Sequence, residues 1–413
     1  MDKILIKNIL SLFSVQGVNY LIPLLIIPHL VRTMGIDGFG KYSFVLAVVQ
    51  YFIILSDYGF NLSASKQVAV HKDNKNYISK IFTSVMLCKF FFVFFGFLIM
   101  NFIVFITPSF HGDRYLYNIA FLCVIGSSLF PSWLFQGYEK MSWIALSNFI
   151  SRGVGLVFVF TLVNEKDDIG IALLIQGATG LAASIIGLYF AFSNKLTSIA
   201  FVSFSDAREQ LIKGGSIFAS TFSVSLYTTS IPLILGLTSG VASVGIYSAA
   251  DKIRLALQGV IGPFSQALYP RVSKLMTISS ERAMSLVRRT SIFILFPTLC
   301  ISVFICFFSQ EVIFFMYGEG HELSASILRI IIWAIPIVAA GNILGIQVLL
   351  PVGLQRYFGF TYILAGIIGL PLMYISSNFY SFWGVAVATI YIELQNVIFF
   401  LLIVKFKFQK RVG

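Results

Sequence analysis

Polar and ionisable side chains interrupt the apolar segments of this chain at helical spacing. In the segment 42–65, Ser43, Gln50, Asp57 and Asn61 are separated by 7, 7 and 4 residues, so they share one face of a helix. A carboxylate that faced lipid would be strongly destabilising, so this face must lie against protein or water. A stripe of this kind can bind a polar solute or a coupling ion.

A second stripe follows the same periodicity in the segment 246–269. It contains Tyr247, Asp251, Arg254 and Gln258. A guanidinium group can hold phosphate oxygens through two hydrogen bonds, which suits an anionic solute. The neighbouring carboxylate can bind a proton or cation, or it can simply pair with the arginine.

Hydroxyl groups and amides form similar faces in two further apolar segments. The face in 214–237 consists of Ser216, Ser220, Ser223, Tyr227 and Ser230, and that in 8–30 of Gln16 and Asn19 beside Pro23. Small hydroxyl residues also let helices pack closely without any solute. Close packing does not, however, account for the charged groups Asp251 and Arg254.

Five basic residues lie inside apolar segments, where cations are rare. They are Lys89, Arg152, Lys252, Arg254 and Arg329. Arg152 is the deepest, whereas Lys89 and Arg329 could instead extend to the membrane surface as anchors. We expect a solute site formed by Arg152, Arg254, Lys89, Gln50, Gln258 and Tyr247, with Asp57, Asp251 and Glu393 as candidates for ion coupling.

No catalytic or metal-binding pattern accompanies these residues. The four cysteines lie in apolar segments without a CxxC pair, and the four histidines are scattered, so we expect no cofactor and no metal. The loops are short and carry no paired carboxylates or nucleophile motif, which argues against an enzyme.

The elements that must position these groups are membrane-spanning helices. The chain is 58% hydrophobic and 11% charged, with a mean hydropathy of +0.89, far from the composition of soluble domains. Runs of about 20 apolar residues predict an all-α membrane protein with twelve transmembrane helices. Their ranges are 8–30, 42–65, 81–106, 116–137, 143–163, 169–192, 214–237, 246–269, 288–308, 325–350, 357–376 and 383–404.

The basic residues favour one side of the membrane. If the N-terminus is cytoplasmic, the cytoplasmic segments hold 20 of the 29 basic residues and the outer loops hold 4. This asymmetry predicts cytoplasmic termini and explains the net charge of +12 without a nucleic-acid partner.

Short matches about 205 residues apart indicate an internal repeat. Gly40 and Ser43 bound one copy of a Gly-x-Tyr-Ser motif, and Gly245 and Ser248 bound the other. Six helices per copy would place both copies in the membrane in the same sense. We therefore expect two pseudo-symmetric six-helix lobes, 1–195 and 196–413.

Three stretches carry a resemblance to a known family. They are GFGKYSFVLAVVQYFIILSDYGFNLSASKQVAV, PSWLFQGYEKMSWIALSNFISR at 131–152, and YSAADKIRLALQGVIGPFSQALYPRVSKL at 247–275. The chain resembles the Wzx O-antigen flippases, a polysaccharide-transporting branch of the multidrug/oligosaccharidyl-lipid/polysaccharide exporter superfamily. The resemblance implies two V-shaped lobes of the MATE type and alternating access.

The resemblance also implies a cargo and partners. The cargo would be an undecaprenyl-pyrophosphate-linked oligosaccharide, exported across a bacterial inner membrane. Membrane lipid would be a partner, together with polysaccharide polymerase and chain-length proteins. Two alternatives stay open: a cation-coupled multidrug exporter of the same fold, and a membrane-embedded polymerase or ligase.

Overall fold

The computed structural model describes the backbone of residues 3–259 and 261–408. Side chains are described for residues 22–407 except 109, 216, 219–221, 223, 224, 226, 227, 260 and 267. The side chains of Gln16, Asn19, Ser216, Ser220, Ser223 and Tyr227, predicted to lie on polar faces, are therefore outside the described part. Helices make up almost all of the described residues, which contain no β-strand.

Eight helical segments of the described chain are long and apolar enough to cross a membrane. They are Ile22–Val70, Lys75–Ile106, Phe110–Gly137, Met141–Leu162, Ile169–Ser193, Ser280–Phe307, Glu322–Leu349 and Gln355–Lys407. The first and the last each overlap two predicted spans, because the backbone leaves the helical conformation at Gly35 (φ 70°) and Ser381 (φ 50°). The eight segments thus overlap ten predicted spans. The other two predicted spans, 214–237 and 246–269, fall on the four helices Phe204–Thr229, Ile231–Thr238, Val241–Gln258 and Ile261–Ile278.

The chain divides into two compact units. The first unit comprises residues 33–225, and the second comprises 1–32 together with 226–413. We describe each unit separately. The expectation of six-helix lobes divided at residue 195 stays a prediction.

The first unit begins in α1 and ends in α9. Its elements are α1 (Lys3–Asp57, from residue 33), α2 (Phe60–Val70), α3 (Lys75–Ile106), the short 3-10 helix η1 (Pro108–Asp113), α4 (Arg114–Ala120), α5 (Leu122–Leu129), α6 (Ser132–Gly137), α7 (Met141–Leu162), α8 (Ile169–Ser193) and α9 (Phe204–Thr229). The predicted span 116–137 is divided among α4, α5 and α6, with Phe130 extended ahead of Pro131 because a residue before proline avoids the helical conformation.

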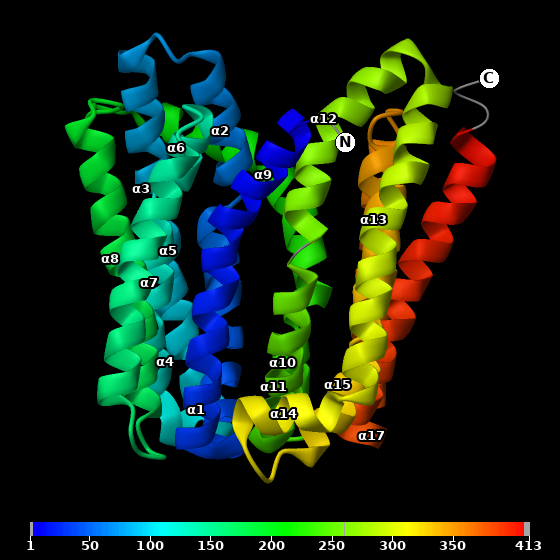
Figure 1. Ribbon diagram of the computed structural model, residues 1–413. Helices are drawn as coiled ribbons and strands as arrows, with labels where there is room; N and C mark the ends of the chain where they lie inside the picture. The colour runs from blue at the N-terminus through cyan, green and yellow to red at the C-terminus, as the bar shows by residue number, and fades with distance from the viewer. Residues whose placement is uncertain (1–2, 260, 409–413) are drawn as a thin grey trace. The chain divides into compact units, whose positions relative to one another are not determined.

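Small residues bring helices of the first unit together. A Cβ atom on Gly126 of α5 would lie only 2.7 Å from the carbonyl carbon of Gly180 on α8, and the Ser184 hydroxyl donates to the Gly126 carbonyl oxygen. Figure 1 shows α7 and α8 side by side. Trp133 and Phe60, both fully buried, belong to a hydrophobic core formed mainly by α2, α3 and α6.

The second unit contains the remaining elements. These are α10 (Ile231–Thr238), α11 (Val241–Gln258), α12 (Ile261–Ile278), α13 (Ser280–Phe307), α14 (Ser309–Tyr317), α15 (Glu322–Ile331), α16 (Ala334–Asn342), the π-helix η2 (Ile343–Leu349), α17 (Gln355–Ile403) and η3 (Val404–Phe408). Helices α11 and α15 pack together. The Tyr317 hydroxyl donates to the Ala249 carbonyl oxygen at 2.9 Å, which ties the end of α14 to α11.

Candidate functional site

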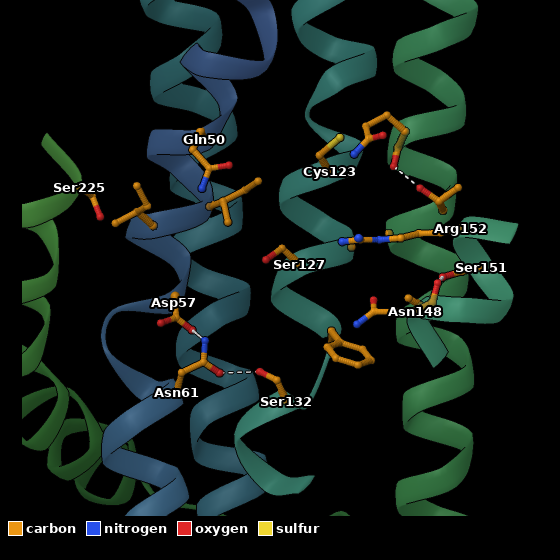
Figure 2. A pocket seen from close by; sticks show the side chains of 18 of the residues that line it. Gln50, Asp57, Asn61, Cys123, Ser127, Ser132, Asn148, Ser151, Arg152 and Ser225 are labelled. Atoms are coloured by element: carbon orange, nitrogen blue, oxygen red, sulfur yellow. Dashed lines mark hydrogen bonds between the residues drawn. The ribbon is translucent and has the colours of Figure 1, made fainter. Parts of the chain in front are cut away.

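A polar cavity of about 500 Å³ lies within the first unit. Gln50 and Asp57 of α1 and Asn61 of α2 line one wall (Figure 2). These are three members of the predicted stripe. Ser43, the fourth, is buried and is not among the lining residues. These three residues of the stripe therefore face a cavity. This agrees with the expectation that ionisable groups inside a membrane protein face protein or water instead of lipid.

Asp57 is the last residue of α1, and the chain turns sharply behind it. Tyr58 and Gly59 both have left-handed backbone conformations, with φ angles of 43° and 73°, and α2 begins at Phe60. Glycine adopts this conformation freely, whereas tyrosine does so at a cost. The turn directs Asp57 and Asn61 to the same cavity although they belong to different helices.

Asp57 is held by an ion pair and a hydrogen bond. Its carboxylate lies 3.7 Å from Lys89 Nζ of α3 and accepts a 2.7 Å hydrogen bond from Asn61 Nδ2. The Asn61 amide oxygen accepts a hydrogen bond from the Ser132 hydroxyl. Lys89 is only 3% exposed, so it is buried in protein instead of extending outward as an anchor.

Arg152 of α7 lies on the wall opposite α1. Figure 2 shows its side chain extending into the cavity toward Ser127, with Asn148 one turn earlier on the same helix. Arg152 is the only cation among the described lining residues. Lys89 lies behind Asp57 and pairs with its negative charge, so Arg152 is left as the positive charge that favours an anionic solute.

Further polar groups come from helices for which the sequence predicted no site. Ser127 of α5 and Gln176 and Thr179 of α8 also line the cavity. Gln176 and Thr179 are three residues apart in an apolar helix, a weak signal that could have been noticed. Amides and hydroxyls of this kind can replace water around sugar hydroxyl groups.

The polar stripe of the second unit is arranged differently. Arg254 is 9% exposed, and its Nε and Nη2 atoms each lie 2.7 Å from Asp251 Oδ1. Its Nη1 atom donates to Gln258 Oε1 at 2.6 Å. All three residues belong to α11, so most partners of the guanidinium group lie on its own helix. Two of its five N–H donors have no part in these contacts.

Four other residues of the second unit were singled out in the sequence, and the structure describes the surroundings of each. The Tyr247 hydroxyl is 3.1 Å from Thr389 Oγ1 of α17, and Glu393, also on α17, is partly buried. Lys252 is exposed. Arg329 donates from Nε to the Ser309 hydroxyl at 3.2 Å. The roles predicted for these residues stay predictions.

The described residues form no candidate metal site. They include no group of three or more His, Cys, Asp or Glu side chains placed to hold a metal ion. All four cysteines are free thiols.

Comparison with known proteins gives a consistent result. A family model described as "Polysaccharide biosynthesis protein" matches residues 5–276. A protein of Escherichia coli (strain K12) named "Putative O-antigen transporter" is 32% identical over 94% of this chain and 93% of its own length. A protein of the same name from Shigella dysenteriae is 29% identical over 97% of this chain and all of its own length.

Solved structures are similar in fold. An inward-facing multidrug resistance MATE family transporter of the MOP superfamily has a TM-score of 0.74, 13% identity, and covers 92% of both chains. The lipid II flippase MurJ, in an inward closed conformation, has a TM-score of 0.75, 15% identity, and covers 95% of this chain and 87% of its own. The predicted fold class is therefore confirmed: this is an all-helical, multi-pass membrane protein of the MATE type. The family model covers more than half of the chain, and the two relatives align with more than nine-tenths of it, so the chain belongs to the polysaccharide biosynthesis protein family.

Proposed function

We propose that this chain is a flippase that moves a lipid-linked oligosaccharide across a bacterial inner membrane by alternating access. The observation that carries this proposal is the 32% identity, along nearly the whole chain, to a protein named as an O-antigen transporter. The cargo that this class implies is an undecaprenyl-pyrophosphate-linked unit, with polysaccharide polymerase and chain-length proteins as further partners.

The cavity of the first unit supports a cargo of this chemistry. The barrier to flipping comes from the sugars and the pyrophosphate, because the polyprenyl tail can stay in lipid. Arg152 supplies a charge for phosphate oxygens, and Gln50, Asn148 and Gln176 supply amides for sugar hydroxyls. A volume of about 500 Å³ suits part of a head group, so the site proposed here binds one portion of the cargo.

The direct test is complementation of a strain that lacks this gene. Expression of the full chain should restore surface polysaccharide and remove the lipid-linked units that accumulate in the membrane. If the protein inserts normally but the units continue to accumulate, the proposal is wrong. A polymerase defect would give a different result, because single units would still reach the outer face.

The orientation follows from the charge asymmetry and has its own test. We propose that both termini are cytoplasmic. In a cysteine-free background, a cysteine at the exposed Asp73 should react with an impermeant thiol reagent only after the membrane is opened, whereas one at the exposed Asp167 should react in intact spheroplasts. The reverse pattern would invert the topology.

A multidrug exporter of the same fold is the second candidate. Such an exporter needs an acidic group that is available to a cationic cargo. Asp57 is the only acid among the described lining residues of this cavity, and it is already paired with Lys89. This pairing favours the oligosaccharide flippase.

A further inference from the structure

The segment 195–213, which we call the arm, joins α8 to α9 and includes the first turns of α9. One face of the arm is attached to the first unit by hydrogen bonds. The Tyr138 hydroxyl donates to the Leu196 carbonyl oxygen at 3.0 Å, the Ala200 N–H donates to Thr83 Oγ1 at 3.0 Å, and the Ser198 N–H donates to a hydroxyl of α3 at the same distance. These bonds fix which side of the arm faces the first unit.

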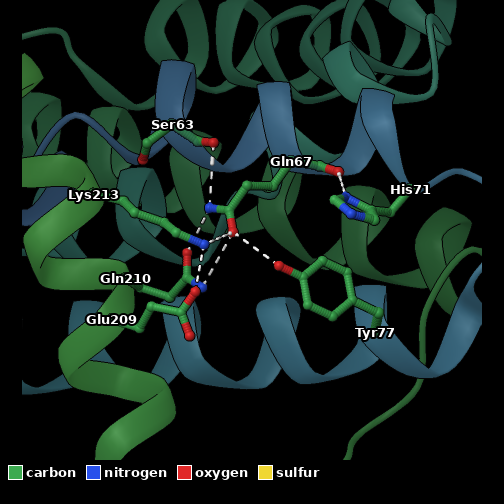
Figure 3. Close-up of polar contacts among 7 residues, drawn as sticks. All are labelled: Ser63, Gln67, His71, Tyr77, Glu209, Gln210 and Lys213. Carbon is green, nitrogen blue, oxygen red and sulfur yellow. Dashed lines mark hydrogen bonds and ion pairs between the residues drawn. The ribbon is translucent and has the colours of Figure 1, made fainter.

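A polar cluster attaches the end of the arm. Figure 3 shows Gln67 of α2 at its centre. Its amide nitrogen donates to Gln210 Oε1 at 2.8 Å, and its amide oxygen accepts from Lys213 Nζ at 2.9 Å. Beside the cluster, a Cβ atom on Gly214 would lie 2.7 Å from the Tyr58 carbonyl oxygen, so the backbones approach closely. The arm is therefore held along one side by α2, α3 and Tyr138, and these contacts prevent it from rotating to bury its other side.

The other side of the arm is apolar and exposed. Phe201 and Phe204 are 102% and 86% exposed, and Ile199 and Ile212 are 80% and 67% exposed. Large apolar side chains concentrated in so short a segment are rarely left in water, so they mark a partner surface or a membrane surface.

The exposed charged side chains of the arm carry a net positive charge. The Asp206 carboxylate accepts hydrogen bonds from the Ser203 N–H at 2.7 Å and the Ser203 hydroxyl at 2.9 Å, forming the N-terminal cap of α9. These bonds hold the pKa of Asp206 below its usual value. Glu209 is paired with Lys213. The exposed Lys195 and Arg208 make no ion pair with any described residue.

We propose that the arm lies in the interfacial layer of the bilayer, with Phe201 and Phe204 inserted among the lipids and with Lys195 and Arg208 against anionic head groups. The arm starts two residues after Ser193, the end of a candidate membrane span. Phe201 is eight residues beyond that end, which limits its reach to roughly 26 Å of extended chain. Basic side chains beside aromatic ones are typical of segments that lie in the membrane interface.

The test uses a spin label in the full chain, purified and reconstituted in nanodiscs. In a cysteine-free background, a label replacing Phe201 should be more accessible to oxygen than to a water-soluble nickel complex. A label replacing the exposed Glu165, in the loop between α7 and α8, serves as the matched control and should show the opposite preference. Equal nickel accessibility at 201 and 165 would overturn the proposal.

The choice of lipid tests the proposed head-group contact. The oxygen preference at position 201 should increase when phosphatidylcholine is replaced by phosphatidylglycerol, and this increase should be lost in the variant K195Q/R208Q. No dependence on the head group would overturn the anionic contact. Because the nanodiscs contain no other protein, a water-exposed label there that becomes protected in native membranes would indicate a protein partner and would also contradict the proposal.

Discussion

Two arginines of the predicted membrane spans, Arg152 and Arg254, stand in contrasting surroundings. Arg254 of the second unit has Asp251 and Gln258 as partners on its own helix. Arg152 of the first unit extends into a cavity lined by residues from six helices besides its own, namely α1, α2, α5, α6, α8 and α9. One arginine has its partners on its own helix, while the other lines a cavity formed by several helices.

This contrast shows what helical periodicity can and cannot indicate. Both arginines belong to polar faces of apolar helices, and the spacing Asp-x-x-Arg-x-x-x-Gln permits local pairing by itself. The spacing of Asn148 and Arg152 offers no acid. An arginine without an acid on its own helical face is therefore the stronger candidate for a binding role in a membrane helix.

Replacing Arg152 should have the largest effect of all the changes, a fall in the rate of export. If export did not fall, the contrast between the two arginines would be wrong. Arg152→Ala should reduce export at least about tenfold, because each charge-assisted contact that is lost costs roughly 1.5–3 kcal/mol. Arg152→Lys should restore export in part, since an ammonium group keeps the charge but not the planar fork. The measurement is export rate normalised to inserted protein.

The matched control for this experiment is Arg114→Ala, which removes an exposed arginine of α4. It should leave export unchanged. A normal export rate in Arg152→Ala would remove the cavity from the transport path.

The ion pair between Asp57 and Lys89 should give the next largest effect, chiefly on stability. Asp57→Asn leaves Lys89 charged and 3% exposed, which should lower the free energy of unfolding by about 3 kcal/mol. The double variant D57N/K89M should recover most of that loss. Unfolding in mixed detergents measures the stability of the single and the double variant.

The double variant also separates coupling from stability. If Asp57 takes up and releases a proton during transport, D57N/K89M should be folded but unable to export against a gradient. Glu393→Gln makes the corresponding change in the second unit. Wild-type export by both variants over a range of proton gradients would exclude both acids from coupling.

The pair Asp251 and Arg254 provides the equivalent test in the second unit. Asp251→Ala and Arg254→Ala should each destabilise the protein by about 3 kcal/mol, and the double variant should regain stability. We expect its export to stay low, because the sequence predicts Arg254 in the solute site and two of its N–H donors remain after its contacts within α11. Recovery of both stability and export would show that the pair serves only the fold.

Much of the architecture could be predicted from the sequence, because apolar runs of membrane length are a strong signal. The division of the predicted span 116–137 into α4, α5 and α6 was missed, although Pro131 marks one of the breaks. The left-handed turn at Tyr58 was also missed, since nothing in a tyrosine indicates that conformation.

The candidate site could be predicted only helix by helix. Gln50 and Asp57 share one periodic face of α1, so their common wall was predictable. Asn61 reaches the same cavity through the turn at Tyr58 and Gly59, which breaks the single helix predicted for 42–65. The contact between Lys89 and Asp57, and the contribution of Gln176 from α8, depend on which helices become neighbours. Spacing along one helix carries no information about that choice.

Two glutamines give the smallest and most selective comparison. Gln50 lines the cavity, whereas Gln258 accepts a hydrogen bond from Arg254. Gln258→Leu should therefore lower the free energy of unfolding by about 1.5 kcal/mol, since a hydrogen bond to a charged group is lost in a buried setting.

Gln50→Leu should leave the stability nearly unchanged but slow export several-fold, because an amide that can replace water around the cargo is lost. Unfolding in mixed detergents and export rate, measured on both variants at equal abundance, give two readings for each. If the two glutamine variants change stability and export in the same proportion, the distinction between a displayed polar face in the first unit and a self-paired one in the second does not hold.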